Sequence, residues 1–292
     1  MRVAIGGSTG LIGTALGRHL VRSGHEVVRL VRGAVTASDQ RHWDPDAGRI
    51  DGPGLDDVDA VVNLAGSPIG GVRWTKERKA EIRRSRTTAT LTIVTQLAPD
   101  GRCQRLLNGS AVGYYGDTGT EIVDETFPPG RGFLSRVVTD WEAAADHSPV
   151  PTAKLRTGQV LTRDGGYLAM QWPLFALGLG GKIASGYQFV SWISMIDHLR
   201  AIEFLLTSDL TGSVNLSSPN PVSNAEFTAT FGAHLNRPTP LPLPLPAVQL
   251  LFGREFVREA LLTGQRVRPA RLLAAGFEFQ QPTLMQAFAA IG

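Results

Sequence analysis

The stretch Arg2-Val3-Ala4-Ile5-Gly6-Gly7-Ser8-Thr9-Gly10-Leu11-Ile12-Gly13 decides the fold of this chain. Its first apolar residues predict a buried strand, and the apolar spacing after Gly10 predicts a helix that ends near Gly24. Gly7, Gly10 and Gly13 lie between the two, three residues apart. Glycines there let a pyrophosphate approach the main chain at a helix N-terminus, where free N–H groups and the helix dipole favour anions. The stretch therefore predicts the nucleotide-binding turn of a Rossmann-type fold.

Short β-branched runs alternate with amphipathic stretches from this turn to about residue 157. The pattern predicts strands at 3–5, 27–31, 60–64, 105–108 and 152–155, a helix at 76–97 and another at 133–145. A loop is expected from Gly109 to Gly116. Such alternation is typical of βα units that build a doubly wound parallel sheet in an α/β protein. We expect residues 1–157 to form the Rossmann domain, with room for later segments to return to the sheet.

The composition changes after Gly158, where glycine-rich stretches and an alternating run of prolines at 238–246 interrupt the βα rhythm. Alternating prolines favour an extended polyproline conformation, here as a stiff spacer before an apolar helix near Val248. We expect residues 158–292 to form a smaller substrate lobe that includes a C-terminal helical domain.

The composition narrows the class of protein. The 292 residues carry a formal net charge of +3, with basic residues scattered among acids, which does not favour nucleic-acid binding. The single cysteine, Cys103, rules out an intrachain disulfide, and the histidines lack metal-ligand spacing. The strand at the start leaves no room for a signal peptide, and no apolar run reaches eighteen residues. We expect a cytoplasmic protein without a metal site or a membrane span.

Arg32 ends the second predicted strand, nineteen residues after Gly13, at the position that distinguishes the two nicotinamide cofactors. An acidic residue there binds the ribose 2′-hydroxyl of NAD, whereas an arginine suits the 2′-phosphate of NADP. Arg29 lies three positions earlier, so the adenosine side is expected to be basic. The site predicts NADP(H), against the alternative that Arg32 is an ordinary exposed arginine.

Two further patterns bear on the site. Leu64, Ala65 and Gly66 follow a buried strand and form a small-residue exit that a cofactor could approach closely. Gly6-Gly7-Ser8-Thr9-Gly10 also satisfies the Gly-x-Ser-x-Gly nucleophile elbow of hydrolases. That alternative explains neither Gly13 nor Arg32, and we rank it behind the nucleotide site.

The chain also resembles a known family across nearly its whole length. The resemblance lies in the N-terminal glycine turn, Asn63-Leu64-Ala65-Gly66, Arg73-Trp74-Thr75, Trp141-Glu142-Ala143-Ala144-Ala145, Leu155-Arg156-Thr157-Gly158, Gly178-Leu179-Gly180-Gly181, Ser191-Trp192-Ile193, Asn224-Ala225-Glu226-Phe227 and Ala274-Ala275-Gly276-Phe277. Together these stretches resemble an atypical short-chain dehydrogenase/reductase group, the NAD-dependent epimerase/dehydratase-like family with a C-terminal domain of unknown function.

The resemblance implies an extended short-chain dehydrogenase fold that holds NADP(H) along Gly7, Ser8, Thr9, Gly10, Leu11, Ile12 and Gly13, at Arg32, and at Leu64, Ala65 and Gly66. It further implies cofactor contacts from Glu81 and Arg86 on the long helix and from Ser135 near the nicotinamide end. From composition alone, Glu81 and Arg86 would be interpreted as surface charges and Ser135 as a serine at the start of a helix. Members of this superfamily often form homodimers, so the resemblance also allows one here.

The catalytic residues are harder to predict, because the wider superfamily transfers protons with a Tyr-x-x-x-Lys pair. The residues four positions after the four tyrosines are Thr118, Gly119, Gln171 and Ser191, so no such pair exists. Ser110 lies where the superfamily places a hydroxyl near the reacting carbon, although Ala111 could occupy that place instead. Tyr115, or Tyr114, could supply a proton or could pack over the cofactor.

Two functions fit these observations. The first is an NADP(H)-dependent oxidoreductase or epimerase acting on a carbonyl or sugar-nucleotide-type small molecule. The alternative is a non-catalytic protein that senses NADP(H) and changes the shape of its second lobe. Five aromatic residues of that lobe could line an apolar pocket or form core: Trp172, Phe175, Tyr187, Phe189 and Trp192.

Overall fold

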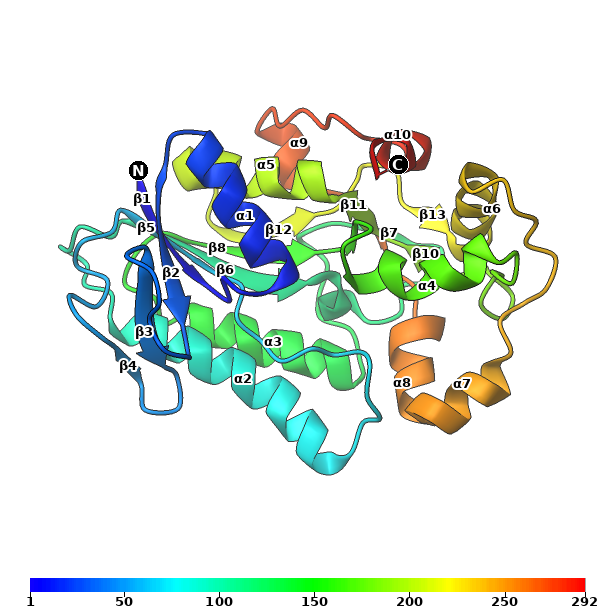
Figure 1. Ribbon diagram of the computed structural model, residues 1–292, viewed down its shortest axis with the longest axis horizontal. Coiled ribbons are helices and arrows are strands. Elements are labelled where there is room, and N and C mark those ends of the chain that lie inside the picture. The colour runs from blue at the N-terminus through cyan, green and yellow to red at the C-terminus, as the bar shows by residue number, and fades with distance from the viewer. Residues whose placement is uncertain (292) are drawn as a thin grey trace.

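The computed structural model describes residues 1–291 and contains a central sheet of eight strands (Figure 1). Gly292, the last residue of the expected second lobe, lies outside the described residues. The strand order across the sheet is β12 (Gly212–Leu216), β8 (Thr152–Thr157), β6 (Arg105–Ala111), β5 (Ala60–Asn63), β1 (Arg2–Gly6), β2 (Glu26–Val31), β3 (Gln40–Asp44) and β4 (Arg49–Ile50). Neighbours pair in parallel except β3 and β4. The chain winds outward from β1 in both directions, which confirms the predicted doubly wound sheet.

Helices cover both faces of this sheet (Figure 1). On one face lie α1 (Leu11–Arg22) and α5 (Met195–Thr207), and on the other lie α2 (Lys76–Thr95) and α3 (Phe133–Ala145). Side chains of β1 alternate between the two cores, as in any strand. Val3 and Ile5 pack in the core that includes α1 and α5, while Ala4 packs in the core that includes α2.

Residues beyond 157 contribute to this same sheet. Strand β12 pairs with β8, and helix α5 packs against α1. Ser194 caps α5 by accepting a hydrogen bond from the Asp197 N–H at 3.1 Å. The buried Asp197 carboxylate accepts the N–H groups of Gln280 and Gln281, each at 2.8 Å. The C-terminal segment is thereby fixed to the sheet layer.

The remaining chain forms smaller units, most of them beside the carboxyl edge of the sheet. They are β7 (Ile122–Val123), β9 (Gln159–Leu161), α4 (Gly166–Ala176), β10 (Phe189–Val190), β11 (Trp192–Ser194), β13 (Val222–Ser223), α6 (Asn224–His234), α7 (Leu245–Phe252), α8 (Arg254–Phe256), a π-helical turn η2 (Val257–Leu262), β14 (Arg266–Val267), α9 (Ala270–Ala274) and α10 (Leu284–Ile291). Three two-stranded pairs hold them together: β10 with β13, β11 with β9, and β14 with β7. None of the described helices is both long and apolar enough to cross a membrane.

The predicted loop from Gly109 to Gly116 is wrong. Strand β6 continues through Ala111, and Val112–Tyr115 form a short 3-10 helix, η1. Pairing explains the difference, because β6 lies between β5 and β8 and Ser110 is in register with Arg156. Flanking strands on both sides outweigh the weak strand preference of a glycine and a serine.

Candidate active site

The three glycines of the turn have three different surroundings. Gly7 has a φ of 74°, and a Cβ there would lie 2.8 Å from the backbone of Leu64. A Cβ at Gly13 would collide with the Gly7 carbonyl oxygen, so this glycine lets the helix pack against the turn. A Cβ at Gly10 would meet only the Gly7 oxygen, at 3.3 Å. The turn is therefore closed on its protein side and open beside Gly10, where a pyrophosphate would approach.

The first turn of α1 is ready to bind an anion. Gly10 is its N-cap residue and provides no side-chain hydrogen bond. Thr9 and Gly10 are exposed, while the Ser8 hydroxyl is buried and donates to the Leu30 carbonyl at 3.1 Å. Ser8 therefore ties the turn to β2, a position unlike the exposed serine of a nucleophile elbow.

Arg32 and Arg29 have different surroundings. Arg29 forms two hydrogen bonds with the Asp39 carboxylate, at 2.7 and 2.8 Å, and this carboxylate raises its pKa. Arg32 follows β2, is exposed, and makes no ion pair within residues 1–291. Because β2 neighbours β1, Arg32 lies at the same sheet edge as the glycine turn. The expectation that both arginines form a basic pocket is wrong for Arg29, since Asp39 neutralises it.

The loop after β5 is held by helix α2. Leu64, Ala65 and Gly66 begin this loop, and the Ala65 N–H donates to the Asn63 side chain at 3.2 Å. At the next residue, the Ser67 hydroxyl donates to Glu81 at 2.8 Å, and Arg86 donates to the Ser67 carbonyl at 3.1 Å. Glu81 and Arg86, which only the resemblance brought forward, thus both fix Ser67.

Arg86 is a buried cation. Its guanidinium also donates to the Ile82 carbonyl at 2.8 Å and lies over the Trp141 ring, 5.2 Å from the centroid. No carboxylate pairs with it among the described residues. Burial, with a smaller effect of the Arg78 charge, lowers the pKa of Arg86 to about 10. The side chain remains charged at neutral pH and lines the main cavity, where it favours an electron-rich ligand.

The main cavity has a volume of about 650 Å³, within the usual range for small-molecule sites. It begins at Leu11 and Ile12 of the glycine turn and passes Ser110 and Ala111 at the end of β6. From there it runs past Thr157 to residues of α4, of the 177–191 segment and of the segment from Leu243 to Gln265. The carboxyl edge of a doubly wound sheet is where such folds bind ligands.

Ser110 lies at the cavity wall, on a buried charged network. Its hydroxyl donates to Glu142 Oε1 at 2.6 Å. Glu142 and Arg156 form a doubly hydrogen-bonded ion pair, with distances of 2.8 and 2.9 Å, and are almost fully buried. The Ser110 hydroxyl proton is therefore used in the hydrogen bond to Glu142, while the lone pairs of its oxygen are free to accept a hydrogen bond from a ligand. Ala111 follows in the same cavity wall.

Tyr115 lies behind this wall. Its phenol donates to Asn215 at 2.7 Å and accepts from Arg156 at 3.0 Å, and the side chain is buried. Burial raises the pKa of Tyr115 to about 12. The Arg156 guanidinium lies 3.4 Å from the Tyr114 ring centroid. The described cavity wall includes Gly113 and Gly116 but neither tyrosine.

Ser135 and Glu259 lie at the N-terminus of α3. The Ser135 hydroxyl is buried, 2.9 Å from the carbonyl oxygens of both Tyr114 and Gly130. Glu259, from the π-helical turn η2, accepts the N–H of Phe133 at 2.8 Å. Both line the cavity. Glu259 therefore occupies a helix terminus that would otherwise attract an anion.

His198 is a buried neighbour of the cavity that the sequence analysis did not bring forward. Its Nε2 lies 3.2 Å from the Thr157 hydroxyl, which lines the cavity, and its Nδ1 has no hydrogen-bond partner in the described chain. Burial lowers the pKa of His198 to about 4, so the ring is neutral at pH 7. The sequence does not indicate that Thr157 and His198 are in contact, because elements such as β9 and α4 lie between them in the chain.

The five aromatic residues of the second lobe occupy three kinds of position: the cavity wall, the core and the exposed surface. Phe175 and Phe189 line the cavity. Trp192 is fully buried in a core with Phe227 and Phe231, against which Trp172 packs. Tyr187 is 79% exposed, so neither expectation holds for it.

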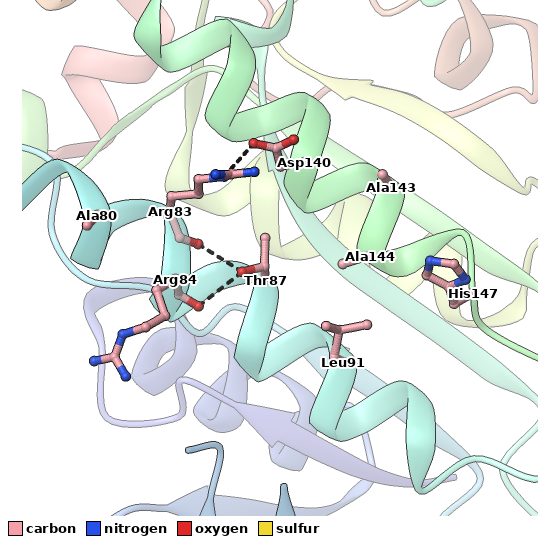
Figure 2. Close-up of a pocket in the computed structure, with 9 residues that line it drawn as sticks. All are labelled: Ala80, Arg83, Arg84, Thr87, Leu91, Asp140, Ala143, Ala144 and His147. Carbon is pink, nitrogen blue, oxygen red and sulfur yellow. Dashed lines mark hydrogen bonds and ion pairs between the residues drawn. The ribbon is translucent and has the colours of Figure 1, made fainter. Parts of the chain in front are cut away.

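A second hollow, of about 470 Å³, lies between α2 and α3 and shares no lining residue with the main cavity (Figure 2). Arg83 reaches across it to Asp140 at 2.6 Å, and Thr87 turns its hydroxyl toward backbone carbonyls of its own helix. The glycine turn, the buried cation and Ser110 all lie elsewhere, so we place the chemistry in the main cavity. Within residues 1–291, no group of three or more His, Cys, Asp or Glu side chains converges for a metal ion.

Two family models match the chain. The NAD dependent epimerase/dehydratase family matches residues 3–143, and a domain of unknown function matches residues 243–291. An epimerase family protein of Mycobacterium bovis is 47% identical over 289 residues, which cover 98% of this chain and 95% of the relative. The human epimerase family protein SDR39U1 is 38% identical over 297 residues, covering 97% of each chain.

Solved structures agree with these relationships. Human SDR39U1, isoform 2, with NADPH superposes with a TM-score of 0.92 at 37% identity, over 100% of this chain and 99% of that chain. A nucleoside-diphosphate sugar epimerase from Corynebacterium glutamicum superposes with a TM-score of 0.81 at 33% identity, over 99% of this chain and 57% of that chain. The family that the sequence resembles is thereby confirmed.

Proposed function

The chain belongs to the NAD-dependent epimerase/dehydratase family, and on that premise we propose that it binds NADP(H) and acts on a small molecule carrying a carbonyl or alcohol group. One observation carries the proposal: a single cavity joins the glycine turn to Ser110 and to the second lobe. NADPH is the molecule with which human SDR39U1 was solved. A protein that bound a nucleotide alone would not need the continuation of the cavity past Ser110.

The residues present fit this cofactor. The backbone from Gly7 to Gly13, closed behind and open beside Gly10, would hold the pyrophosphate, and Arg32 would hold the 2′-phosphate. Leu64, Ala65 and Gly66 would follow the cofactor along the edge of the sheet. Arg86 and Ser135 would lie toward the nicotinamide, while Glu81 acts by fixing Ser67. Bound nicotinamide supplies hydride transfer.

The protein's own groups would orient the substrate oxygen. Ser110 offers lone pairs to the hydroxyl of an alcohol substrate, or of the alcohol that forms when a carbonyl is reduced, because its own proton is hydrogen-bonded to Glu142. Arg86 favours negative charge developing on an oxygen nearby, because it is a buried cation without a carboxylate partner in the described chain. We assign substrate contact to Ser110 and a positioning role, through Arg156, to Tyr115.

Hydride transfer from labelled NADPH tests the proposal. Protein saturated with NADPH that carries deuterium at C4 is incubated with panels of aldehydes, ketones and sugar nucleotides, and products are analysed by mass spectrometry. We expect deuterium in at least one product, and a large loss of that product in Ser110→Ala at unchanged NADPH affinity. Tight NADPH binding without deuterium transfer to any panel member would contradict the enzyme proposal.

A non-catalytic NADP(H) sensor is the second candidate, and the missing Tyr-x-x-x-Lys pair favours it. In that case NADPH should change the segment from Leu243 to Gln265, which forms one wall of the cavity. Hydrogen exchange of that segment with and without NADPH measures this. A change in exchange together with no turnover favours the sensor.

We also propose that the protein forms a homodimer and is located in the cytoplasm. We place a homodimer contact on the outer face of α2 and α3, where Leu91 is 41% exposed. Sedimentation of wild type and Leu91→Glu tests this, since a dimer across that face should dissociate in the variant. The sensor, the dimer and the location can each fail without affecting cofactor binding.

A further inference from the structure

We infer that the substrate half of the cavity takes an uncharged, largely apolar carbonyl compound and not a nucleoside-diphosphate sugar. The inference rests on the proposed function, because it assigns the half that NADP(H) would leave free. We call this half the outer chamber and define it by Met170, Leu174, Leu179, Leu243, Phe256 and Leu261. The related Corynebacterium protein is a nucleoside-diphosphate sugar epimerase, so the two classes of ligand need to be distinguished.

The apolar side chains of the outer chamber are not all buried by the protein. Met170 is 58% exposed, Leu174 is 42% exposed and Leu179 is 60% exposed, although all three line the cavity. Large apolar side chains gathered at the mouth of a cavity mark a binding surface for apolar molecules. An apolar ligand would remove this surface from water, whereas a sugar would not.

Four of the polar side chains that line the cavity already have partners within the protein. Gln188 donates to the Ile183 carbonyl at 3.0 Å, and Gln265 donates to the Gly116 carbonyl at 2.8 Å. Ser191 donates to the Gln265 carbonyl at 2.6 Å, and Asn224 accepts from the Ile183 N–H at 2.7 Å. A hexose buried here would leave several hydroxyls with few free partners, at a cost in free energy for each.

The charges of the chamber oppose a diphosphate. Glu259 is directed to the N-terminus of α3, and its carboxylate occupies the donors that could otherwise bind phosphate. Arg131, the one basic residue in the described wall besides Arg86, is exposed and makes no ion pair. Glu259 is only partly buried and also pairs with Arg258 at 3.3 Å. One exposed arginine does not balance the two charges of a diphosphate.

Two segments far apart in the sequence build the chamber. Helix α4 with the residues after it provides one wall, and residues from Leu243 to Leu261 provide the other. The second wall falls within the region 243–291 that matches a domain of unknown function. The inference therefore gives that domain a role, which is to select the apolar part of the substrate.

The test measures binding in the full chain saturated with NADP⁺, which has no hydride to transfer to a ketone. The ligands are straight-chain methyl ketones from 2-butanone to 2-decanone and, separately, UDP-glucose. Calorimetry reports binding without turnover. We expect affinity to rise by up to about fourfold for each added methylene, the fold-change that corresponds to about 0.8 kcal/mol. UDP-glucose should bind more weakly than 2-decanone.

Matched variants locate the site. Leu174→Gln should weaken 2-decanone binding about five- to tenfold, since it places an amide in the apolar wall. Leu177→Gln is the control, because Leu177 is 73% exposed and does not line the cavity. Both changes lie at exposed positions, so the fold should survive. Arg131→Ala should leave ketone binding unchanged.

The outcomes separate this inference from the proposed function. If NADP⁺ binds but ketone affinity does not rise with chain length, or UDP-glucose binds more tightly than 2-decanone, the inference is overturned and the cofactor proposal stands. Equal ketone affinities in Leu174→Gln and Leu177→Gln would also overturn it. If NADP⁺ itself does not bind, the proposed function has failed first.

Discussion

Buried charged side chains lie in and beneath the wall of the site. Glu142 and Arg156 are paired beneath Ser110, whereas Arg86 lines the cavity without a carboxylate. The sequence suggested Arg86 only through the family resemblance, because a buried arginine and a surface arginine look alike in a helical pattern. Glu142 appeared only as part of a family motif.

Breaking the buried ion pair of Glu142 should lower the free energy of unfolding far more than breaking the exposed ion pair of Asp140 on the same helix. Glu142→Gln leaves Arg156 charged and buried, so we expect a loss of about 3–5 kcal/mol in the free energy of unfolding. Asp140→Asn breaks the exposed pair with Arg83 and should cost about 0–1 kcal/mol. Urea denaturation measures both variants. Equal losses would show that the network beneath Ser110 does not act as a buried ion pair.

His198 should make stability depend on pH. Its folded pKa of about 4 lies below the ordinary value of 6.5, so the unfolded chain binds the extra proton between these values. Stability should be unaffected by this group above pH 6.5 and should fall as pH decreases toward 4, by at most about 3 kcal/mol. Unfolding of wild type and His198→Gln at a series of pH values measures the difference. A wild-type slope no steeper than that of His198→Gln between pH 6.5 and 4 would contradict the assignment.

Several strands and helices before residue 158 could be predicted closely. The strand at 3–5 and helix α3 at 133–145 match the structure within one or two residues, because apolar periodicity and glycine positions agree there. The end of β6 could not be predicted, since its last residues form a strand only through pairing with β5 and β8. The small pairs β9–β11 and β7–β14 also depend on partners distant in sequence.

Helix α1 offers a matched test of the turn. A Cβ at Gly13 would collide with the turn, so Gly13→Ala should destabilise the protein and abolish nucleotide binding. Gly17 lies in the same helix, where a Cβ would find only the Ile5 side chain at 4.0 Å. Gly17→Ala should instead stabilise the protein by about 0.5–1 kcal/mol. Thermal unfolding and NADPH titration compare them. Normal NADPH affinity in Gly13→Ala would exclude the turn as the binding site.

The whole molecule does not divide simply at residue 157. The apolar faces of β8 and α1 pack against β12 and α5, which come later in the chain. The sheet therefore contains strands from both sides of residue 157. The expected division into a Rossmann domain and a substrate lobe stays a prediction about which part binds cofactor and which binds substrate. The cavity could not be predicted either, because its walls combine segments from Leu11 to Gln265 that only the fold brings together.

Truncation tests this interdependence. A chain of residues 1–157 would expose the edge of β8 and the face of α1 that α5 covers. We expect this fragment to aggregate or to lack a cooperative transition, whereas the full chain unfolds cooperatively. Size-exclusion chromatography and circular dichroism measure both properties. A soluble, monomeric fragment with a sharp transition would show instead that the first 157 residues form an autonomous domain.

The central claim, that NADP(H) binds on the glycine turn with Arg32 at its 2′-phosphate, is tested most directly by calorimetric titration of NADPH and NADH into wild type, Arg32→Ala and Arg29→Ala. We expect wild type to prefer NADPH, and Arg32→Ala to lose about ten- to hundredfold in NADPH affinity while NADH affinity is unchanged, since one charge-assisted contact is removed. Arg29→Ala should lose much less, because Asp39 already binds Arg29. Equal binding of NADPH and NADH by wild type would contradict the role of Arg32, and no binding of either would contradict the site.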